Sequence, residues 1–370
     1  MPICIYIGAP NGALFFYFYY IGNISYSMNM SDLFERLLIL RMPNIGPVNY
    51  GKLLDRFGGD VRAAAASLGA DDAHVASVRR EMDRAAELDI HYICDTDAYY
   101  PAALRVLKNH PPVLSARGNL ETLRRPAVAM VGTRHATAAG MEFMANLATN
   151  FAAHGIAVVS GMAIGTDAAA HRGALRADGN AQTIAVLAGG CDNIWPIENE
   201  SLYWEIVSRG VVISEMPVGM SPIASNFVQR NRWVAGIGQK LILGEADKKS
   251  GSMHTARFAQ EFGRKIYAIP SHPADSRGAG PNSLIKSGAA ELCVGVPDFP
   301  ELENNSQSLQ KKTKKDTGEN SLLDKLGTIP VSESVLAEIV KKNISEIKRD
   351  LVVLELQGLV RKVDSGYIRI

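Results

Sequence analysis

Short apolar runs alternate with stretches of helix length over residues 126–298 of this 370-residue chain. The helical stretches include 138–153 and 167–177, and the short runs between them are rich in Val and Ile, which favours buried strands. Strands that alternate regularly with helices form a parallel sheet with helices on both faces, so we predict an α/β fold. The predicted strands are Ala127–Val131, Ile156–Ser160, Thr183–Leu187, Val211–Ser214, Lys240–Leu243, Lys265–Ile269 and Glu291–Val294.

The pattern changes on both sides of this core, which we place at residues 111–298. Residues 30–110 have helical apolar spacing interrupted by Gly and Pro turns, so they predict a small helical domain. Residues 299–320 are polar and charged and almost lack apolar side chains, which predicts a flexible linker. Residues 321–370 predict three helices followed by a hairpin, and this order is typical of a winged-helix domain.

The first 29 residues form an atypical extension. Residues 13–21 have the sequence ALFFYFYYI, an apolar and aromatic run much shorter than the roughly 20 residues of a membrane-spanning helix. No Lys or Arg precedes Arg36, so the basic start of a secretory signal is missing. We interpret residues 1–29 as a poorly ordered extension from an upstream start, with a short packed element as the alternative. We expect no membrane association.

Charge and cysteine content narrow the classes of function. The formal net charge is only +1 at pH 7, which excludes a globally basic protein, so nucleic-acid binding would have to come from individually placed arginines. The four cysteines are far apart, form no C-x-x-C pair and have no histidine cluster beside them, which argues against a zinc site. We therefore expect no metal and no cofactor, and a reducing cytoplasm as the setting.

Turn-forming and polar residues follow several of the predicted strands, where ligands bind in open α/β sheets. Arg134 follows the first strand, and its guanidinium suits phosphate oxygens, with a surface ion pair as the alternative. The turn Ser160–Asp167 contains Gly161 and Gly165, which allow a close backbone approach, and it opens a helix whose N–H groups attract anions. Such a turn is weak evidence by itself.

Two further segments have the same character. Asn226–Arg232 holds two arginines, an amide and Phe227, which suits phosphates and a stacked base, although the aromatic residues could instead belong to the core. Lys249–Thr255 starts another helix that favours anions, or is an ordinary capped helix. No G-x-x-x-x-G-K-[ST] segment occurs in the sequence, which disfavours a P-loop ATPase or GTPase.

In their order and spacing these segments resemble the DNA-processing protein A family, also called DprA or Smf. The resemblance implies an extended Rossmann-like core with an N-terminal helical SAM-like domain and a C-terminal winged-helix domain. The motifs that carry it are Val131–Arg134, Ser160–Leu175, Thr183–Leu187, Trp195–Asn199, Ile213–Pro217, Asn226–Arg232, Ser250–Ala256 and Tyr267–Pro270.

The same resemblance implies a function. It points to a homodimeric recombination mediator in natural transformation, which binds incoming single-stranded DNA and loads the RecA recombinase. Val228 stands where the family usually has Pro, and Ile197 stands where a basic contact is sometimes found, so the affinity for DNA could be lower. By motif position, the implied DNA contacts are Arg134, Ser160, Gly161, Met162, Gly165, Asp167, Phe227, Arg230, Asn231, Arg232, Ser250, Gly251, Ser252 and Thr255.

The alternative is a nucleotide-processing enzyme on a related Rossmann core, similar to the phosphoribohydrolases. Their P-G-G-x-G-T loop is missing, and we find neither paired carboxylates for nuclease chemistry nor a Ser-His-Asp arrangement. Among Asp167, His171 and Glu215, the only acid–base candidates, we interpret Asp167 as a helix cap and His171 as a packed residue. We therefore predict a DNA-binding protein without catalysis. A transcription regulator is less favoured, because the predicted recognition helix 344–357 carries mixed charges.

Overall fold

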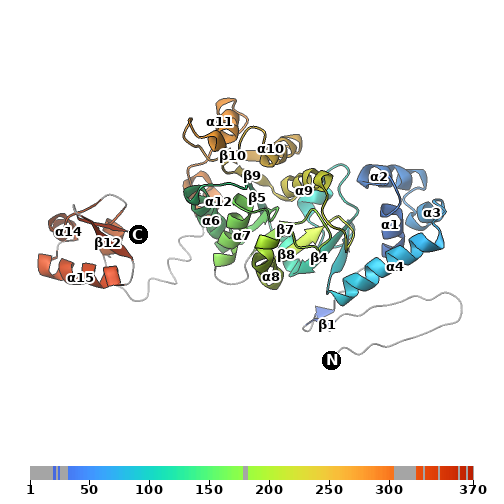
Figure 1. Ribbon diagram of the computed structural model, residues 1–370, viewed down its shortest axis with the longest axis horizontal. Coiled ribbons are helices and arrows are strands. Elements are labelled where there is room, and N and C mark those ends of the chain that lie inside the picture. The colour runs from blue at the N-terminus through green and yellow to red at the C-terminus, as the bar shows by residue number, and fades with distance from the viewer. Residues whose placement is uncertain are drawn as a thin grey trace. The chain divides into compact units, whose positions relative to one another are not determined.

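The computed structural model describes residues 32–177, 182–303, 322–327, 330–340, 342–356, 359–363 and 366–369, together with a pair of two-residue strands, β1 (Tyr20–Ile21) and β2 (Ile24–Ser25) (Figure 1). The chain forms two compact units, residues 1–303 and 304–370. Apart from β1 and β2, the predicted extension 1–29 lies outside the described residues. None of the described helices has the length and apolar character needed to cross a membrane.

The first unit is built on a nine-stranded sheet with the order β11-β10-β9-β5-β6-β7-β8-β4-β3. All neighbours from β11 to β8 pair in parallel, which confirms the predicted α/β core. Every predicted strand is present, three of them in full, three shorter by one residue and the last, β11, at half its predicted length. These strands are β5 (Ala127–Val131), β6 (Ala157–Ser160), β7 (Thr183–Val186), β8 (Val211–Ser214), β9 (Lys240–Leu243), β10 (Lys265–Ala268) and β11 (Glu291–Leu292).

Two more strands extend the sheet where the sequence pattern predicts no strand. β4 (Val113–Gly118) pairs antiparallel with β8, and β3 (His91–Cys94) pairs antiparallel with β4. The prediction that residues 30–110 are entirely helical is therefore wrong at β3. A run of four residues is too short to show a period of its own, so its pairing with β4 decides its conformation.

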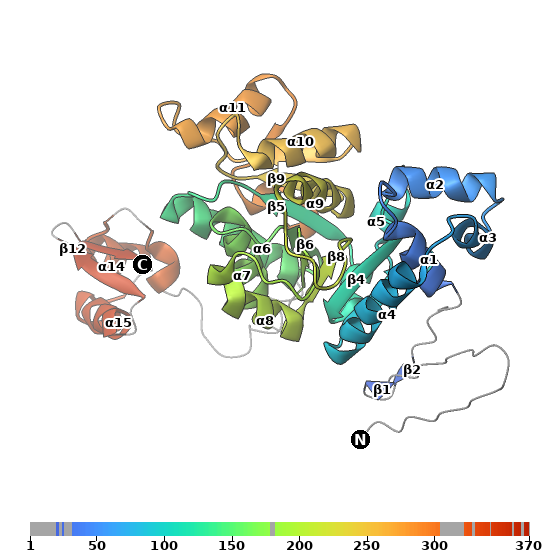
Figure 2. The same cartoon turned by 45° about the vertical axis from the view of Figure 1, so that its right-hand side comes forward.

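Helices cover both faces of the sheet, with α9 and α10 on one side and α6, α7 and α8 on the other (Figure 2). Side chains alternate along β5, where Val131 packs in a cluster with Trp233 and Met130 packs in a cluster with Phe151. Burial on both faces explains why the strands are continuous apolar runs. The helices are α5 (Ala102–Arg105), α6 (Ala138–Ala153), α7 (Thr166–Arg176), α8 (Glu200–Arg209), α9 (Ala224–Ile237), α10 (Gly251–Glu261) and α11 (Ala279–Lys286).

Four helices precede the sheet and confirm the helical N-terminal region. Glu81 on the last of these helices is a buried carboxylate that accepts two hydrogen bonds of 2.7 Å from Arg41. It also accepts a bond from the Tyr92 hydroxyl at 2.9 Å and one from the Val218 N–H at 3.2 Å, so it links the helices to the sheet and to the loop after β8. The helices are α1 (Leu33–Leu40), α2 (Pro47–Arg56), α3 (Val61–Ala66) and α4 (Asp72–Glu87).

The first unit extends to residue 303, past the predicted start of the linker at residue 299. Phe299 is completely buried, with its ring centroid 5.0 Å from that of Phe151 and 4.7 Å from that of Tyr267. It leads into the short helix α12 (Pro300–Glu303). This segment is polar overall but contains one aromatic side chain, Phe299. Burial of that ring stabilises the segment in spite of the charged residues around it. Residues 304–320 lie outside the described residues.

The second unit contains its helices and strands in the predicted order. A short 3-10 helix (Leu322–Lys325) precedes α14 (Glu333–Val340), α15 (Ile344–Leu356) and an antiparallel hairpin of β12 (Val360–Val363) and β13 (Gly366–Arg369). The winged-helix assignment stays a prediction. The unit has its own apolar core, which includes Leu336, Ile347, Leu351, Val360 and Tyr367.

The burial of Phe299 can be tested by its removal. Phe299→Ala should lower the free energy of unfolding by about 3–5 kcal/mol, because it deletes a buried ring and leaves a cavity. The measurement is urea denaturation followed by circular dichroism, with Val106→Ala as the control, since Val106 is 79% exposed. If Phe299 belonged to a flexible linker, both variants would unfold at the wild-type urea concentration.

Candidate nucleic-acid interface

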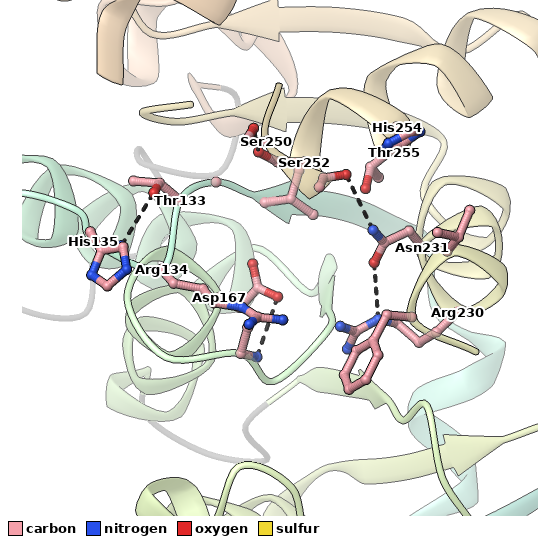
Figure 3. Close-up of a pocket in the computed structure, with 16 residues that line it drawn as sticks. Thr133, Arg134, His135, Asp167, Arg230, Asn231, Ser250, Ser252, His254 and Thr255 are labelled. Atoms are coloured by element: carbon pink, nitrogen blue, oxygen red, sulfur yellow. Dashed lines mark hydrogen bonds between the residues drawn. The ribbon is translucent and has the colours of Figure 1, made fainter. Parts of the chain in front are cut away.

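A pocket of about 350 Å³ opens at the carboxyl edge of the parallel strands. The chain passes from β5 to β6 on one side and later returns to β9 on the other, so the loops after β5 and β9 diverge there and leave a crevice. The starts of α9 and α10 complete its walls. The lining residues are Val131, Gly132, Thr133, Arg134, His135, Ala163, Asp167, Phe227, Val228, Arg230, Asn231, Ser250, Gly251, Ser252, His254 and Thr255 (Figure 3).

The structure brings most of the residues singled out from the sequence to this pocket. Among them, Arg134 and Arg230 extend toward the same space, which the Asp167 carboxyl also faces (Figure 3). Five residues from the same set do not line the pocket: Ser160, Gly161, Met162, Gly165 and Arg232.

Arg230 forms the floor of the pocket and is almost completely buried, at 6% exposure. Its Nη1 donates to the carbonyl oxygens of Gly161 and of Val186, the latter at 3.1 Å. Gly161 provides the room for it, because a Cβ at position 161 would lie 2.5 Å from Arg230 Cζ and 2.9 Å from Asp167 Oδ2. The glycine is therefore required by the close approach of a guanidinium rather than by a turn.

Asp167 and Arg230 are buried charges of opposite sign. Loss of hydration raises the pKa of the Asp167 carboxyl and lowers the pKa of the Arg230 guanidinium, and each group's charge counteracts the shift of the other. Asp167 Oδ2 also accepts the Ala163 N–H at 3.4 Å. Asp167 lies in the first turn of α7, whose N-cap is Gly165, so the interpretation of Asp167 as the helix cap is wrong.

The turn between β6 and α7 is fixed by backbone contacts beneath the pocket. Gly165 has φ +78°, and a Cβ there would lie 2.6 Å from the carbonyl oxygens of Thr133 and Arg134. Met162, although not a glycine, also has a positive φ of +61°, and the buried Asn199 amide donates to its carbonyl at 2.9 Å. The turn thus holds the loop after β5, which carries Arg134, in place.

Arg134 has a different environment from Arg230, because it is exposed. Its guanidinium carbon lies 5.3 Å from the ring centroid of Trp195 and 5.8 Å from that of Phe227. Within the described residues it forms no ion pair, so the alternative of a surface ion pair finds no partner there. Two aromatic rings lie beside this guanidinium, and its N–H groups remain available to an external anion.

The start of α10 forms the opposite wall. Ser250 and Ser252 share a hydrogen bond of 2.7 Å between their hydroxyls, and Thr255, at 1% exposure, lines the pocket one turn further on. Asn231 connects this wall to the floor, because its amide nitrogen donates to the Gly251 carbonyl at 3.2 Å and its amide oxygen accepts the Arg230 Nε–H at 3.0 Å. The first N–H groups of the helix and these hydroxyls can donate hydrogen bonds to an anion.

Arg232 lies away from the pocket although it is next to the pocket residue Asn231. Two helical residues correspond to a rotation of about 200°, so Arg232 and Arg230 are on opposite sides of α9. The Arg232 guanidinium is 5.1 Å from the centroid of the Trp233 ring, and its Nη2 is 3.5 Å from the Lys108 carbonyl oxygen. Sequence spacing alone placed both arginines in one motif, and the helical rotation separates them.

The pocket also contains residues that are not among the fourteen DNA contacts implied by the sequence. Thr133, His135 and His254 line it, and Trp195 packs against Phe227 at its mouth, with ring centroids 4.6 Å apart. Trp195 stands in a motif noted only for its resemblance, and nothing in its spacing connects it to Phe227. An exposed tryptophan beside a proline in a loop is the only signal that could have drawn attention to it.

Of the three acid–base candidates, His171 and Glu215 do not line the pocket. Burial lowers the pKa of His171 to about 3, so it is neutral, and its Nδ1 lies 2.7 Å from the Thr183 hydroxyl. The interpretation of His171 as a packed residue is thereby confirmed. Removal from water raises the pKa of Glu215 to about 7, but this residue does not line the pocket. Within the described part of the chain, no group of His, Cys, Asp and Glu side chains is arranged to hold a metal ion.

Comparisons with known proteins agree with this geometry. Residues 91–302 match the family described as DNA recombination-mediator protein A. The chain is 30% identical over 292 residues to Protein Smf of Escherichia coli, covering 76% of this chain and 78% of that protein. This chain belongs to the DNA recombination-mediator protein A family. It spans between 55% and 79% of the length of the curated Smf and DprA proteins that it matches.

Two solved structures of this family resemble the fold. The X-ray structure of DNA processing protein A from Streptococcus pneumoniae has a TM-score of 0.60 and 29% identity, and covers 72% of this chain and 96% of that chain. A structure of the protein from Helicobacter pylori, described for its single-stranded DNA binding mode, has a TM-score of 0.52 and 30% identity. That match covers 60% of this chain and 96% of that chain.

The close fit of Arg230 beside Gly161 can be tested with one methyl group. Gly161→Ala should lower the free energy of unfolding by about 1–3 kcal/mol, because the Cβ would displace a buried guanidinium from its partners. Gly51→Ala is the matched control, since a Cβ at position 51 in α2 meets nothing within 4 Å. The control should gain roughly 0.5–1 kcal/mol from better helix propensity. A Gly161→Ala variant as stable as the wild type in urea denaturation would contradict the placement of Arg230.

Proposed function

We propose that this member of the DNA recombination-mediator protein A family binds single-stranded DNA in the pocket between β5, β9 and the starts of α9 and α10. The proposal rests above all on Arg134, an exposed guanidinium that lines the pocket beside two aromatic rings and that no carboxylate of the described chain neutralises. A guanidinium beside aromatic rings suits a strand with free bases, because it offers phosphate contacts and stacking together.

The walls of the pocket support the same ligand. The start of α10 presents N–H groups and the hydroxyls of Ser250, Ser252 and Thr255, which suit phosphate oxygens. Phe227 offers a ring to a base, and bases are accessible in this way only when they are not paired and stacked within a duplex. The resemblance to the Helicobacter pylori protein, whose single-stranded DNA binding mode has been described, supports the choice of ligand.

The finer parts of the proposed function follow from the family. We propose that the protein, as a homodimer in the cytoplasm, covers single strands taken up during natural transformation and loads RecA onto them. The description of the matched family as a recombination mediator supports this role. All fourteen DNA contacts implied by the sequence remain proposals, and the five that do not line the pocket are less supported than the nine that do.

Hydrolysis of a nucleotide is the alternative, since a pocket of about 350 Å³ has the size of a nucleotide site. Its weakness is the position of the acid–base groups. The Asp167 carboxyl faces Arg230 and accepts the Ala163 N–H, and Glu215 does not line the pocket. Incubation with nucleoside monophosphates and detection of a released base would favour the hydrolase.

Arg134→Ala should weaken binding of single-stranded oligothymidine by roughly 10- to 100-fold, because a charge-assisted contact to phosphate is lost. The slope of log K against log salt should fall by about 0.7, the amount expected for one released counterion on a single strand. Fluorescence anisotropy over a series of salt concentrations measures both quantities, with the folded state checked by thermal unfolding.

The control is Arg176→Ala, because Arg176 is also exposed but pairs with Glu142 at 3.1 Å near the far end of α7. It should bind oligothymidine as the wild type does. Duplex DNA bound as tightly as single-stranded DNA, or an Arg134→Ala variant with unchanged affinity, would refute the proposed interface.

RecA loading gives a separate prediction. On single strands coated with a single-strand-binding protein, the wild-type protein should shorten the lag before RecA hydrolyses ATP. The Arg134→Ala variant should leave the lag unchanged, because this variant does not occupy the strand. The time course of ATP hydrolysis measures the lag. A lag unchanged by the wild-type protein would exclude the mediator role while leaving single-strand binding intact.

A further inference from the structure

Trp195 is a large aromatic side chain next to the pocket, in contact with both Phe227 and Arg134. It is 38% exposed, although a tryptophan is usually buried more deeply in a soluble protein. Its ring meets that of Phe227 edge to face, with centroids 4.6 Å apart and an interplanar angle of 62°. Trp195 does not line the pocket itself but is more exposed than Phe227, which does, so the two rings form an aromatic surface that continues beyond the pocket lining.

We propose that Trp195 is a second base-stacking site, which holds a nucleobase adjacent to the one on Phe227; this inference rests on the proposed binding of single-stranded DNA. The Arg134 guanidinium is within 5.8 Å of both ring centroids. Because the two ring centroids are 4.6 Å apart, the guanidinium lies beside the pair, where it can bond the phosphate that joins two successive bases while each base stacks on one ring.

The residues around Trp195 favour bases over phosphates. Ile197 is 65% exposed and Val228 is 43% exposed, and both flank the aromatic pair in sequence. Exposed apolar side chains next to an exposed tryptophan cannot bond a phosphate, but they can contact the faces and edges of bases. Ile197 and Val228 therefore suit a strand whose bases turn toward the protein.

The loop that carries Trp195 is also anchored to the pocket. Asn199, four residues further on, donates a hydrogen bond from its amide to the Met162 carbonyl, in the turn between β6 and α7 that Arg230 also contacts. The hydroxyl of Tyr203 on α8 bonds the Cys191 carbonyl at 2.6 Å and holds the start of the same loop. A stacking surface that is held in place before the strand arrives loses less entropy on binding.

A different role for Trp195 would be to hold Arg134 in position without touching DNA. The two roles differ in how they depend on the bases. If Trp195 stacks on a base, its removal weakens binding only when the strand has bases. If it only positions Arg134, its removal weakens phosphate binding to any strand, including one without bases.

The experiment compares Trp195→Ala with the wild type on two strands of equal length, an oligothymidine and the same strand made entirely of abasic sites. Fluorescence anisotropy gives the dissociation constants. Trp195→Ala should bind oligothymidine about 5- to 100-fold more weakly, the range for one lost base–aromatic stack, and should bind the abasic strand like the wild type. Trp195→Phe should recover most of the affinity for oligothymidine.

Trp204→Ala is the matched control. Trp204 on α8 is likewise exposed, at 45%, and its ring lies 4.8 Å from the guanidinium carbon of Arg117, but neither residue lines the pocket. This variant should bind both strands like the wild type. Thermal unfolding of each variant shows that the fold is retained.

Equal losses on the two strands would overturn the stacking role, and so would wild-type affinity in Trp195→Ala. In both cases the wild-type protein still binds oligothymidine, so the proposed function survives. If the wild-type protein itself does not bind oligothymidine, the proposed function fails and the stacking site fails with it.

Discussion

The pocket depends on one buried guanidinium. Arg230 occupies the space that the missing side chain of Gly161 leaves, bonds the carbonyl oxygens of Gly161 and Val186, and faces the carboxyl of Asp167. A buried arginine is tolerated only with its charge compensated and its N–H groups bonded, and removal of either partner would leave an uncompensated charge. The ends of β6 and β7, the start of α7 and the middle of α9 are joined by this single side chain.

The site has two layers, the buried floor and the mouth above it. Charges on the floor are satisfied within the protein, which fixes the geometry but leaves little affinity for an outside ligand. At the mouth, Arg134 and Trp195 are exposed and Phe227 is partly exposed, and among the described residues these side chains have no polar partner that a strand would need to displace. Stability and binding therefore depend on different residues. Substitutions at Arg134 or Trp195 can change the affinity for DNA without unfolding the core. Substitutions at Gly161 disturb the packing of the core itself.

The sequence predicted the parallel core and most of the pocket, because short Val- and Ile-rich runs and glycine turns are local signals. It could not predict β3, whose four residues become a strand only by pairing with β4, nor the burial of Phe299 within a charged segment. In the site, spacing grouped Arg230 with Arg232, although the rotation of α9 directs them to opposite sides. Trp195 was missed because its contact with Phe227 joins loops that are distant in sequence, which only the assembled fold reveals.

The central claim is that a single DNA strand lies across the mouth of this pocket, and photocrosslinking tests it most directly. An oligothymidine that carries 5-iodouracil, irradiated on the full chain and digested with trypsin, identifies the residues in contact with bases. Crosslinks should fall in the peptides of residues 177–209 and 210–230, which contain Trp195 and Phe227. Crosslinks confined to the C-terminal unit, residues 322–369, would contradict the claim.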